Sequence, residues 1–298
     1  MKNFGALLVE ADDDAFLEAR VEPDRALVDL NSVNVRELRT EYVRRQQNYD
    51  TTPFDPEGRM LRLFPGSVSI WSGMPGAGKT TLLRQLACHL LAKGHGVFVA
   101  SFEEEPLDVY YHHVRVAAGS HDPSEHQMQW FIDAFADRFR IWKDDAVLPS
   151  YAGLLAAIRV LARQGVRHAI IDNLMCLDVG AVDWEGQRNF AVQVARTAKL
   201  SGVHIHVVAH PKKITQAGQE PHVHDVAGSK DLSGVCANVL FVRRGDEQTL
   251  GTVGATSMRI SIRKQRHYNG GQGDIDGWFN RATYQYTKGQ WDSEIARY

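Results

Sequence analysis

A glycine-rich octapeptide constrains this chain more than any other feature of its sequence. It matches the pattern G-x-x-x-x-G-K-[ST] with Gly73, Met74, Pro75, Gly76, Ala77, Gly78, Lys79 and Thr80. An apolar run at 68–71 precedes it, and a run with helical periodicity follows at 80–92. Glycines let backbone N–H groups turn toward phosphate oxygens, and a helix N-terminus adds positive potential. The pattern therefore predicts a phosphate-binding loop in which Lys79 contacts the β and γ phosphates, the Thr80 hydroxyl binds Mg²⁺, and Thr81 completes the nucleotide site.

Apolar runs alternate with helical patterns beyond this loop. Buried strands are expected at 68–71, 97–100, 168–171, 204–209 and 239–242, and helices at 80–92, 151–164 and 187–200. This alternation predicts an α/β fold with a mostly parallel central sheet flanked by helices. Period-two alternation at 258–265 and 278–286, around a glycine-rich segment, predicts a C-terminal antiparallel hairpin at the sheet edge.

The first 60 residues differ from the rest and are interpreted as an N-terminal arm, with the main domain at 61–298. They hold 13 acidic and 8 basic side chains, whereas the whole chain has a net charge of -2. A helix expected at 33–48 has only a narrow apolar stripe, so it either packs on its own domain or docks on a neighbouring subunit. A Pro- and Gly-containing linker follows at 51–58.

Composition excludes several classes of protein. With 44% hydrophobic and 23% charged residues, the chain is neither disordered nor collagen-like. Three widely spaced cysteines argue against disulfides and metal clusters and favour a reducing, cytoplasmic compartment. We expect no membrane association, since the sequence contains neither a signal peptide nor an apolar run of about 18 residues.

Carboxylates follow two of the expected strands. Asp172 is the first charge after the run at 169–171, and Glu103 comes soon after the run at 97–100. Because the carboxyl ends of parallel strands meet at one edge of a sheet, both can face the same nucleotide. Asp172 is predicted to hold Mg²⁺ and Glu103 to be the base for hydrolysis, while Glu104 and Glu105 fit a solvated turn.

Five ordered motifs resemble the RecA-like hexameric replicative DNA helicases of the DnaB type, which include bacteriophage primase-helicases and Twinkle. They are the phosphate loop at 73–80, Ser-Phe-Glu at 101–103, Ile-Asp-Asn-Leu at 171–174, Val-Val-Ala-His-Pro-Lys-Lys at 207–213, and Lys-Gln-Arg at 264–266. The resemblance covers about residues 62–290. It implies a RecA-like P-loop NTPase core and makes residues 61–298 an ATPase motor domain.

The resemblance also implies residue roles. Glu103 corresponds to the catalytic glutamate and Asp172 to the magnesium aspartate, while His210 corresponds to a γ-phosphate sensor, or else only caps a turn. Arg266 resembles an arginine finger with Lys264 as its companion, both reaching the neighbouring subunit's site. Alternation along the strand puts these two side chains on the same face. The alternative interpretation is that this face is simply exposed to solvent.

Weaker matches concern the base and the DNA. Arg244 falls in a segment near the nucleotide, and Trp278 falls where a ring stacks on the base, although core packing explains it nearly as well. The polar loop at 212–230 corresponds to a channel loop that grips the DNA backbone, the alternative being a mobile surface loop. Its expected phosphate contacts are Lys212, Lys213, Gly228, Ser229 and Lys230.

The resemblance implies an enzyme that hydrolyses ATP or a dNTP with Mg²⁺. The expected protein is a DNA helicase that translocates on single-stranded DNA as a ring in DNA replication. A phage- or plasmid-encoded replication system is its expected setting, with a separate primase or loader as partner. A homo-oligomer, expected to be a hexamer, would complete the sites. A RecA-like recombination mediator and a nucleotide-gated loader ATPase are the alternative functions.

Overall fold

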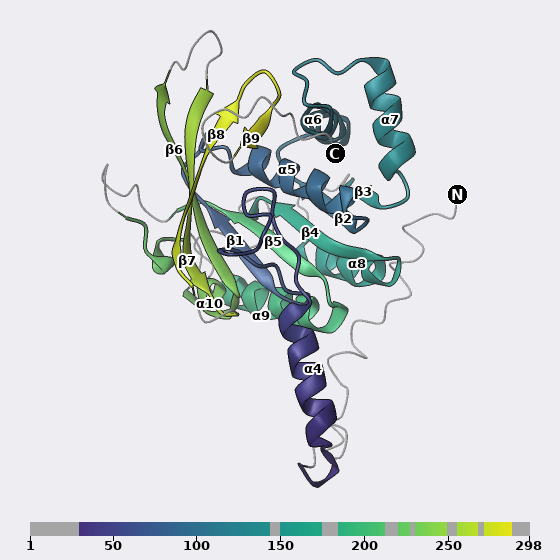
Figure 1. Cartoon of the computed structure of the whole chain (residues 1–298), viewed down its shortest axis with the longest axis vertical. Helices are drawn as coiled ribbons and strands as arrows, with labels where there is room; N and C mark the ends of the chain where they lie inside the picture. Colours follow the sequence, from purple (N-terminus) through teal and green to yellow (C-terminus); the bar gives the residue numbers. More distant parts are fainter. Residues whose placement is uncertain are drawn as a thin grey trace. The chain divides into compact units, whose positions relative to one another are not determined.

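The computed structural model describes residues 30–143, 150–174, 184–211, 220–226, 230–248, 255–267 and 271–287 of the chain (Figure 1). The chain divides into two compact units, Met1–Tyr49 and Asp50–Tyr298. Within the described residues, no helix is both long and apolar enough to cross a membrane.

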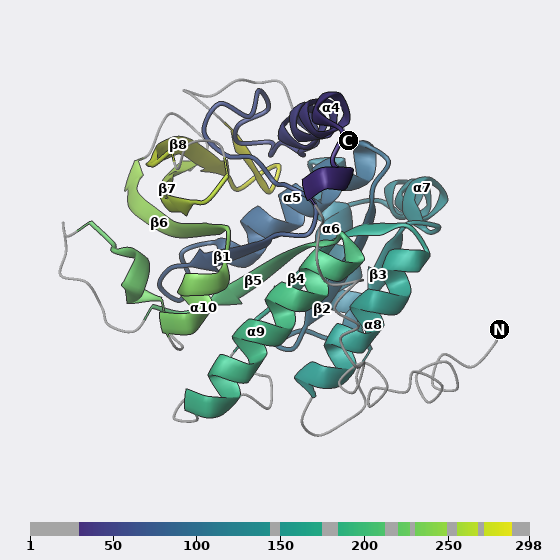
Figure 2. The same ribbon diagram turned by 90° about the horizontal axis from the view of Figure 1, so that it is seen from below.

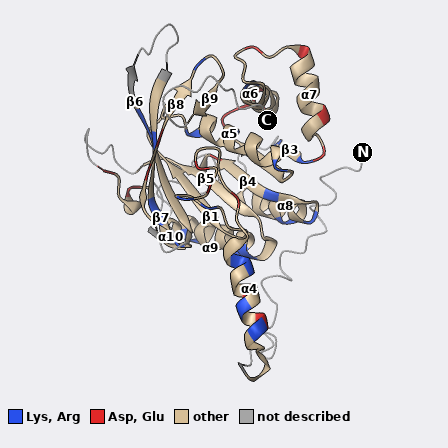
Figure 3. Cartoon of the chain, viewed as in Figure 1, with Lys and Arg blue, Asp and Glu red and all other residues tan. Residues whose placement is uncertain are grey.

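The described part of the first unit is a 3-10 turn, η1 (Leu30–Ser32), followed by helix α4 (Val35–Gln47). The Asn34 side chain caps α4 by accepting hydrogen bonds from the backbone of Arg36 (3.0 Å) and Glu37 (3.4 Å). No residue of α4 is buried, and basic side chains follow its length (Figure 3). The predicted helix is therefore confirmed, whereas its docking on another subunit stays a prediction.

The second unit is built on a sheet whose described strands have the order β3-β2-β4-β5-β1-β6-β7-β8-β9. Pairing is parallel from β3 to β6 and antiparallel from β6 to β9. The parallel strands are β1 (Val68–Ser72), β2 (Gly96–Ser101), β3 (Phe139–Ile141), β4 (Val166–Asp172), β5 (His204–Ala209) and β6 (Asn238–Gln248). The antiparallel extension consists of β7 (Ala255–Gln265), β8 (Gly273–Asn280) and β9 (Gln285–Thr287).

Helices cover both faces of the parallel strands (Figures 1 and 2). One apolar core lies between the sheet and α5 (Lys79–Ala92), α6 (Pro106–Ala118) and α7 (Glu125–Phe135). A second core joins the other face to α8 (Tyr151–Arg163), α9 (Trp184–Ser201) and α10 (Lys230–Val235). A 3-10 turn, η3 (Val223–Asp225), precedes α10. The predicted α/β fold with a mostly parallel sheet and an antiparallel C-terminal addition is confirmed.

Helices α6, α7 and α10 and strand β3 lie outside the sequence prediction, although α6 and α7 carry clear local signals. Helix α6 has Pro106 in its first turn and ends at Gly119, which has a left-handed φ of 60°. Ser124 and Gln127 form a capping box at the start of α7. Strand β3 has only three residues, too few for a periodic pattern. The alternation expected across 278–286 is divided by a turn between β8 and β9.

Residues 50–64 belong to the second unit and precede its first strand. Asp50 and Leu63 form an antiparallel bridge, and Phe54, Asp55 and Leu61 are buried. The Asp55 carboxylate accepts hydrogen bonds from the backbone of Met60 and Leu61 (2.6 and 2.8 Å). These contacts show how the segment before β1 is held. The predicted boundary between an N-terminal arm and the main domain at residue 60 stays a prediction.

A histidine network, comprising Asp50, His95, His168, His204 and His206, lies at the N-terminal halves of β4 and β5. Trp71 donates to Nδ1 of His206 (3.2 Å), so a neutral His206 carries its proton on Nε2, which faces His168 Nδ1 at 3.3 Å. His168 then donates from Nε2 to Asp50 (3.1 Å), whose other oxygen is 2.8 Å from His95. His206 and His168 therefore have a partner at both ring nitrogens while they are neutral.

His204 belongs to a second branch of the histidine network. Its Nδ1 lies 2.8 Å from the Phe64 carbonyl oxygen, which only accepts, so Nδ1 carries the proton. Its Nε2 faces the Ser69 hydroxyl at 2.7 Å, and Asn238 donates to that hydroxyl (2.9 Å). Burial lowers the pKa of His204 to about 3 and also lowers the pKa of His168 and His206.

Candidate functional site

The glycine-rich pattern forms the connection between β1 and α5. Three of its glycines have φ values that side chains rarely adopt, namely 153° at Gly73, 76° at Gly76 and 88° at Gly78. A Cβ at Gly73 would lie 2.3 Å from the Val242 carbonyl oxygen, and one at Gly78 would meet the Tyr286 hydroxyl. Glycine is therefore required both by conformation and by close packing against β6 and β9.

Lys79 begins α5 and points back along the loop. Its Nζ donates to the carbonyl oxygens of Gly73 (2.8 Å) and Met74 (3.0 Å). Burial lowers the pKa of Lys79, whereas the nearby charges of Asp172 and Glu103 oppose this effect. The ammonium group thus lies beside the loop, close enough to both carboxylates for their negative charges to affect its pKa.

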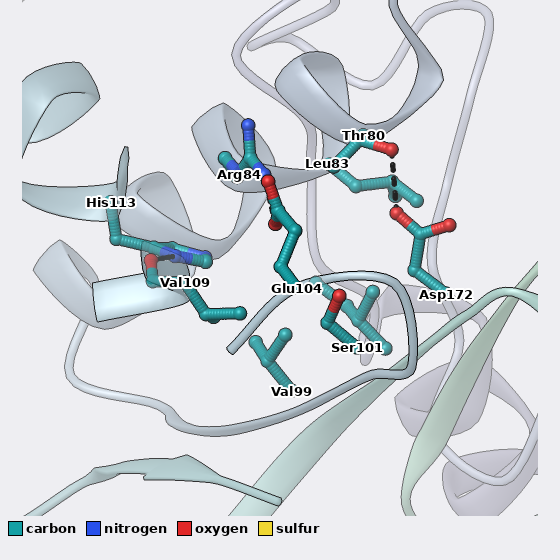
Figure 4. Close-up of a pocket in the computed structure, with 10 residues that line it drawn as sticks. Thr80, Leu83, Arg84, Val99, Ser101, Glu104, Val109, His113 and Asp172 are labelled. Atoms are coloured by element: carbon teal, nitrogen blue, oxygen red, sulfur yellow. Dashed lines mark hydrogen bonds and ion pairs between the residues drawn. The ribbon is translucent and has the colours of Figure 1, made fainter. Parts of the chain in front are cut away.

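The next residue, Thr80, joins the loop to the end of β4. Its hydroxyl donates to Asp172 Oδ2 over 2.6 Å, as Figure 4 shows. β2 and β4 pair in parallel with Ser101 opposite Asp172, so the turn after β2 starts beside this contact. Burial raises the pKa of Asp172 and the Glu103 charge adds to this, while the Thr80 hydrogen bond and the charges of Arg84 and Lys79 lower it.

Glu103 lies in the turn after β2 and is exposed. Its carboxylate accepts a hydrogen bond from the side-chain amide of Asn173, the residue after Asp172. Lys79, Thr80, Glu103 and Asp172 are therefore assembled from α5, the β2–α6 turn and the end of β4. The sequence did not single out Asn173 as a contact of Glu103, although it belongs to the Ile-Asp-Asn-Leu motif.

His210 follows β5, which is paired in parallel with β1 so that Ala209 lies opposite Ser72. His210 thus comes directly after the strand position beside the start of the phosphate loop. Its Nδ1 is buried without a hydrogen-bond partner among the described residues, as is the Ser72 hydroxyl. Two polar atoms near the loop therefore remain available for a ligand or a bound water.

Arg244 lines a cavity of about 180 Å³ beside the loop, while its role near the nucleotide stays a prediction. Gly76, Gly78 and Thr81 line the same cavity, together with Ala77, Thr256, Ser257, Met258, Phe279, Arg281 and Tyr286. Trp278 is not in this lining, whereas its neighbour Phe279, which opposes Thr256 in the β7–β8 pairing, is. The rings beside the loop are therefore Phe279 and Tyr286, which the sequence did not single out.

Lys264 and Arg266 lie at the opposite end of the sheet from the phosphate loop of the same chain. Gln265 pairs with Asn238, and Asn238 pairs with Ser69 near the start of β1. Gly73 is four residues further along, which corresponds to about 13 Å of extended strand. Lys264 Nζ donates to the carbonyl oxygens of Ser233 (2.6 Å) and Gly234 (2.9 Å), and Arg266 donates to Gly234 (2.5 Å).

The predicted DNA contacts cannot be placed in this fold. Lys212, Lys213, Gly228 and Ser229 lie outside the described residues, and of Lys230 only the backbone, at the start of α10, is described. The flanks of this segment are tied together by a bridge between Pro211 and Val226.

The donor set fits a magnesium ion bound together with a phosphate ligand. Mg²⁺ prefers hard oxygen donors and is typically held by one or two carboxylates plus substrate phosphates. Thr80 and Asp172 offer a hydroxyl and a carboxylate in contact with each other. Among the described residues no group of three or more His, Cys, Asp or Glu side chains could form a self-sufficient metal site.

Comparison with protein families gives one match: a family model described as an AAA domain matches residues 36–216, which is more than half of the chain. No curated protein is similar in sequence. Many solved structures have a similar fold, and two of them are described here. The first is described as an ATPase domain and has a TM-score of 0.71 at 16% identity, over 86% of this chain and 98% of that one.

The second solved structure is a DnaB-like replicative helicase, described with its interactions with primase. It has a TM-score of 0.70 and 16% identity, over 95% of this chain and 73% of its own. At this identity the likeness concerns the fold, and it confirms the RecA-like architecture that the motifs predicted.

Proposed function

The chain belongs to the AAA domain family, and from this premise we propose that it is an NTP-hydrolysing DNA helicase motor that translocates on single-stranded DNA as a ring. The observation that carries the proposal is the assembly at the phosphate loop: Lys79, Thr80, Asp172 and Glu103 come together from three separate elements. Hydrolysis of a nucleoside triphosphate needs a phosphate cradle, a metal ligand and a water-positioning carboxylate, and this group supplies all three.

Each residue then has a chemical task. The backbone N–H groups of residues 73–80 and the Lys79 ammonium bind the β and γ phosphates, exchanging the loop carbonyls for phosphate oxygens. Thr80 and Asp172 would hold Mg²⁺, which when bound offsets negative charge on the phosphates. Glu103 orients the attacking water and accepts its proton, while Asn173 fixes the carboxylate. His210 would sense the γ phosphate, and Arg244 would lie near the nucleotide.

The position of Lys264 and Arg266 supports an assembly of several copies. The β6–β7 register separates these cations from the phosphate loop of their own chain, so we propose that they serve the nucleotide of a neighbouring copy. In that copy's site they would offset charge developing on the transferred phosphoryl group. The site is thus completed only in a homo-oligomer, which we propose to be a hexamer.

DNA binding, replication and partners are further parts of the proposal. The structural likeness to a DnaB-like replicative helicase supports a role in DNA replication, with a separate primase or loader as a partner. The backbone contacts of single-stranded DNA would come from residues 212–230, so affinity would decrease with salt.

The test is the rate of ATP and dNTP hydrolysis by the purified chain, with and without single-stranded DNA, over a range of protein concentrations. The proposal expects Mg²⁺-dependent turnover that rises with DNA and, per subunit, with protein concentration. Turnover that is independent of both would contradict a DNA-stimulated ring. Electron microscopy with nucleotide would separate closed rings from the filaments of a recombination protein.

A further inference from the structure

Two consecutive carboxylates in the turn after β2 are bound to different parts of the site. Glu103 accepts from Asn173 at the end of β4. Glu104 instead forms an ion pair with Arg84 of α5, and Figure 4 shows the two side chains next to each other. The turn is thereby attached through its side chains to both elements that carry the predicted magnesium ligands.

Glu104 uses both of its carboxylate oxygens. Oε2 accepts from the Arg84 guanidinium, and Oε1 lies 3.1 Å from Nδ1 of His112 on α6. The side chains of Arg84 and Glu104 are 12% and 26% exposed, so this pair is shielded from solvent far more than an ordinary surface ion pair. Glu104 therefore departs from the solvated-turn interpretation, which remains suitable for the exposed Glu105.

Arg84 is linked to the magnesium ligands by the geometry of its helix. It lies four residues after Thr80, so both side chains are on one face of α5. Together with Glu104, Thr80 and Asp172, Arg84 lines a small cavity of about 10 Å³, which is about the space of one water molecule. The pair of Arg84 and Glu104 thus forms one wall beside the contact between Thr80 and Asp172.

We propose that Glu104 is a positioning residue for hydrolysis: held by Arg84 and His112, it fixes the turn after β2 against α5 and so sets Glu103 beside Lys79 and Asp172. This role rests on the proposed nucleotide hydrolysis. It does not require Glu104 to touch the substrate, because Glu104 acts through the backbone it shares with Glu103. A displacement of about 1 Å in a catalytic group is enough to cost about 10²-fold in rate.

The experiment compares Glu104→Gln with Glu105→Gln, a matched loss of charge in the same turn at an exposed position. We expect Glu104→Gln to lower kcat by about 10- to 100-fold. The KM and the affinity for a non-hydrolysable ATP analogue should stay within about twofold, since the phosphate loop is intact. Glu105→Gln should hydrolyse ATP like the unmodified chain.

Arg84 variants separate positioning from general stability. Arg84→Lys keeps a cation for Glu104 and should retain most of the kcat, whereas Arg84→Met should lose about as much as Glu104→Gln. The double variant Arg84→Met/Glu104→Gln should lose little more than either single variant, because residues that act as a unit are not additive. Thermal unfolding of each variant measures any loss of folded protein.

The outcomes distinguish this role from the proposed function. A hydrolysing unmodified chain together with an unaffected kcat in Glu104→Gln would overturn the positioning role alone. A kcat loss that is matched by equal losses of analogue affinity and thermal stability would also overturn it, in favour of a purely structural pair. An unmodified chain that binds ATP with Mg²⁺ but never hydrolyses it would overturn the proposed function itself.

Discussion

The two ends of the same parallel strands bury polar groups in opposite ways. At the carboxyl ends, Lys79 and Asp172 are buried charged groups whose pKa values are pulled in opposite directions by burial and by each other. At the amino ends, His168, His204 and His206 are buried neutral rings in a series of hydrogen bonds. The first arrangement leaves charge for a ligand to satisfy, whereas the second is satisfied by the protein alone.

This difference separates function from stability along one sheet. Changes in the charged side chains beside the phosphate loop should alter turnover and leave folding nearly unchanged. Changes in the histidine network should do the reverse. A variant of Arg266 tests this comparison most strongly. Arg266 lies at the amino ends of the parallel strands, yet it is proposed to act on a nucleotide.

Arg266→Ala should have the largest effect, lowering the rate of hydrolysis by about 10³-fold or more, since a finger cation offsets charge in the transition state. Steady-state hydrolysis at saturating DNA measures it. Arg259→Ala is the matched control, because Arg259 lies on β7, which ends just before Arg266, and pairs with Asp276 (2.6 Å). Mixing Arg266→Ala with Glu103→Gln chains should restore part of the activity; no recovery would argue against action between subunits.

Glu103→Gln should lower kcat by about 10²- to 10⁴-fold, the usual contribution of a general base. Nucleotide binding and the free energy of unfolding should change little, because Glu103 is exposed and a glutamine can still accept from Asn173. Single-turnover hydrolysis and equilibrium binding give the two quantities. Loss of binding in parallel with kcat would move Glu103 from catalysis to nucleotide binding.

The histidine network should make the fold sensitive to acid. The folded-state pKa values of His168, His204 and His206 are lowered by burial, whereas an unfolded histidine titrates near pH 6.5. As the pH falls below about 6.5, the unfolded chain takes up protons that the folded chain does not. Stability is therefore lost toward lower pH, by about 1.4 kcal/mol per pH unit for each ring that is protonated in the unfolded chain and neutral in the folded chain.

Urea unfolding between pH 8 and pH 5 measures this slope. His206→Gln should reduce it by about 1.4 kcal/mol per pH unit, the share of a single proton. A slope that is unchanged in this variant would show that the acid sensitivity arises elsewhere, for example at His113, whose pKa burial lowers to about 3.

Asp50→Asn should lower the free energy of unfolding by about 1 to 3 kcal/mol at pH 7.5, because His168 and His95 lose the charge of a shared acceptor. Hydrolysis should stay within about twofold of the unmodified chain. Chemical denaturation and turnover of one preparation measure both, with the exposed Asp137→Asn as control. A large loss of turnover without a loss of stability would contradict the assignment of function to the carboxyl ends of the strands and of stability to their amino ends.

Tyr286→Phe should have the smallest effect, about 0.5 to 1.5 kcal/mol in the free energy of unfolding. It removes the hydrogen bond of 3.3 Å from the Tyr286 hydroxyl to the Gly78 carbonyl, while the two backbone contacts of Tyr286 with Gln85 remain. The KM for ATP reports on the loop. A change in KM above about tenfold would show that this hydroxyl shapes the nucleotide site rather than only bracing it.

Local sequence sufficed for the elements with strong periodicity and for the residues in motifs. The phosphate loop, the strands around it and the carboxylate at the end of β4 all lie where the pattern predicted. Helix α6 was not predicted although Pro106 and Gly119 mark its ends, because a run of tyrosines and histidines interrupts its apolar periodicity. Phe279 was not singled out, because a shift of one residue in a strand reverses the face, and only pairing with β7 fixes that register.

The sequence by itself determined the chemistry of the phosphate loop and the alternation that leads to a mostly parallel sheet, because both depend on neighbours within a few residues. Only the tertiary structure decided which distant groups meet. Asp50 joins His168, Glu104 joins Arg84, and Tyr286 packs on Gly78, each across at least 20 residues of chain. Such contacts depend on strand order and helix packing, which no local pattern encodes, and they decide which buried charges are satisfied by the fold and which are left for a ligand.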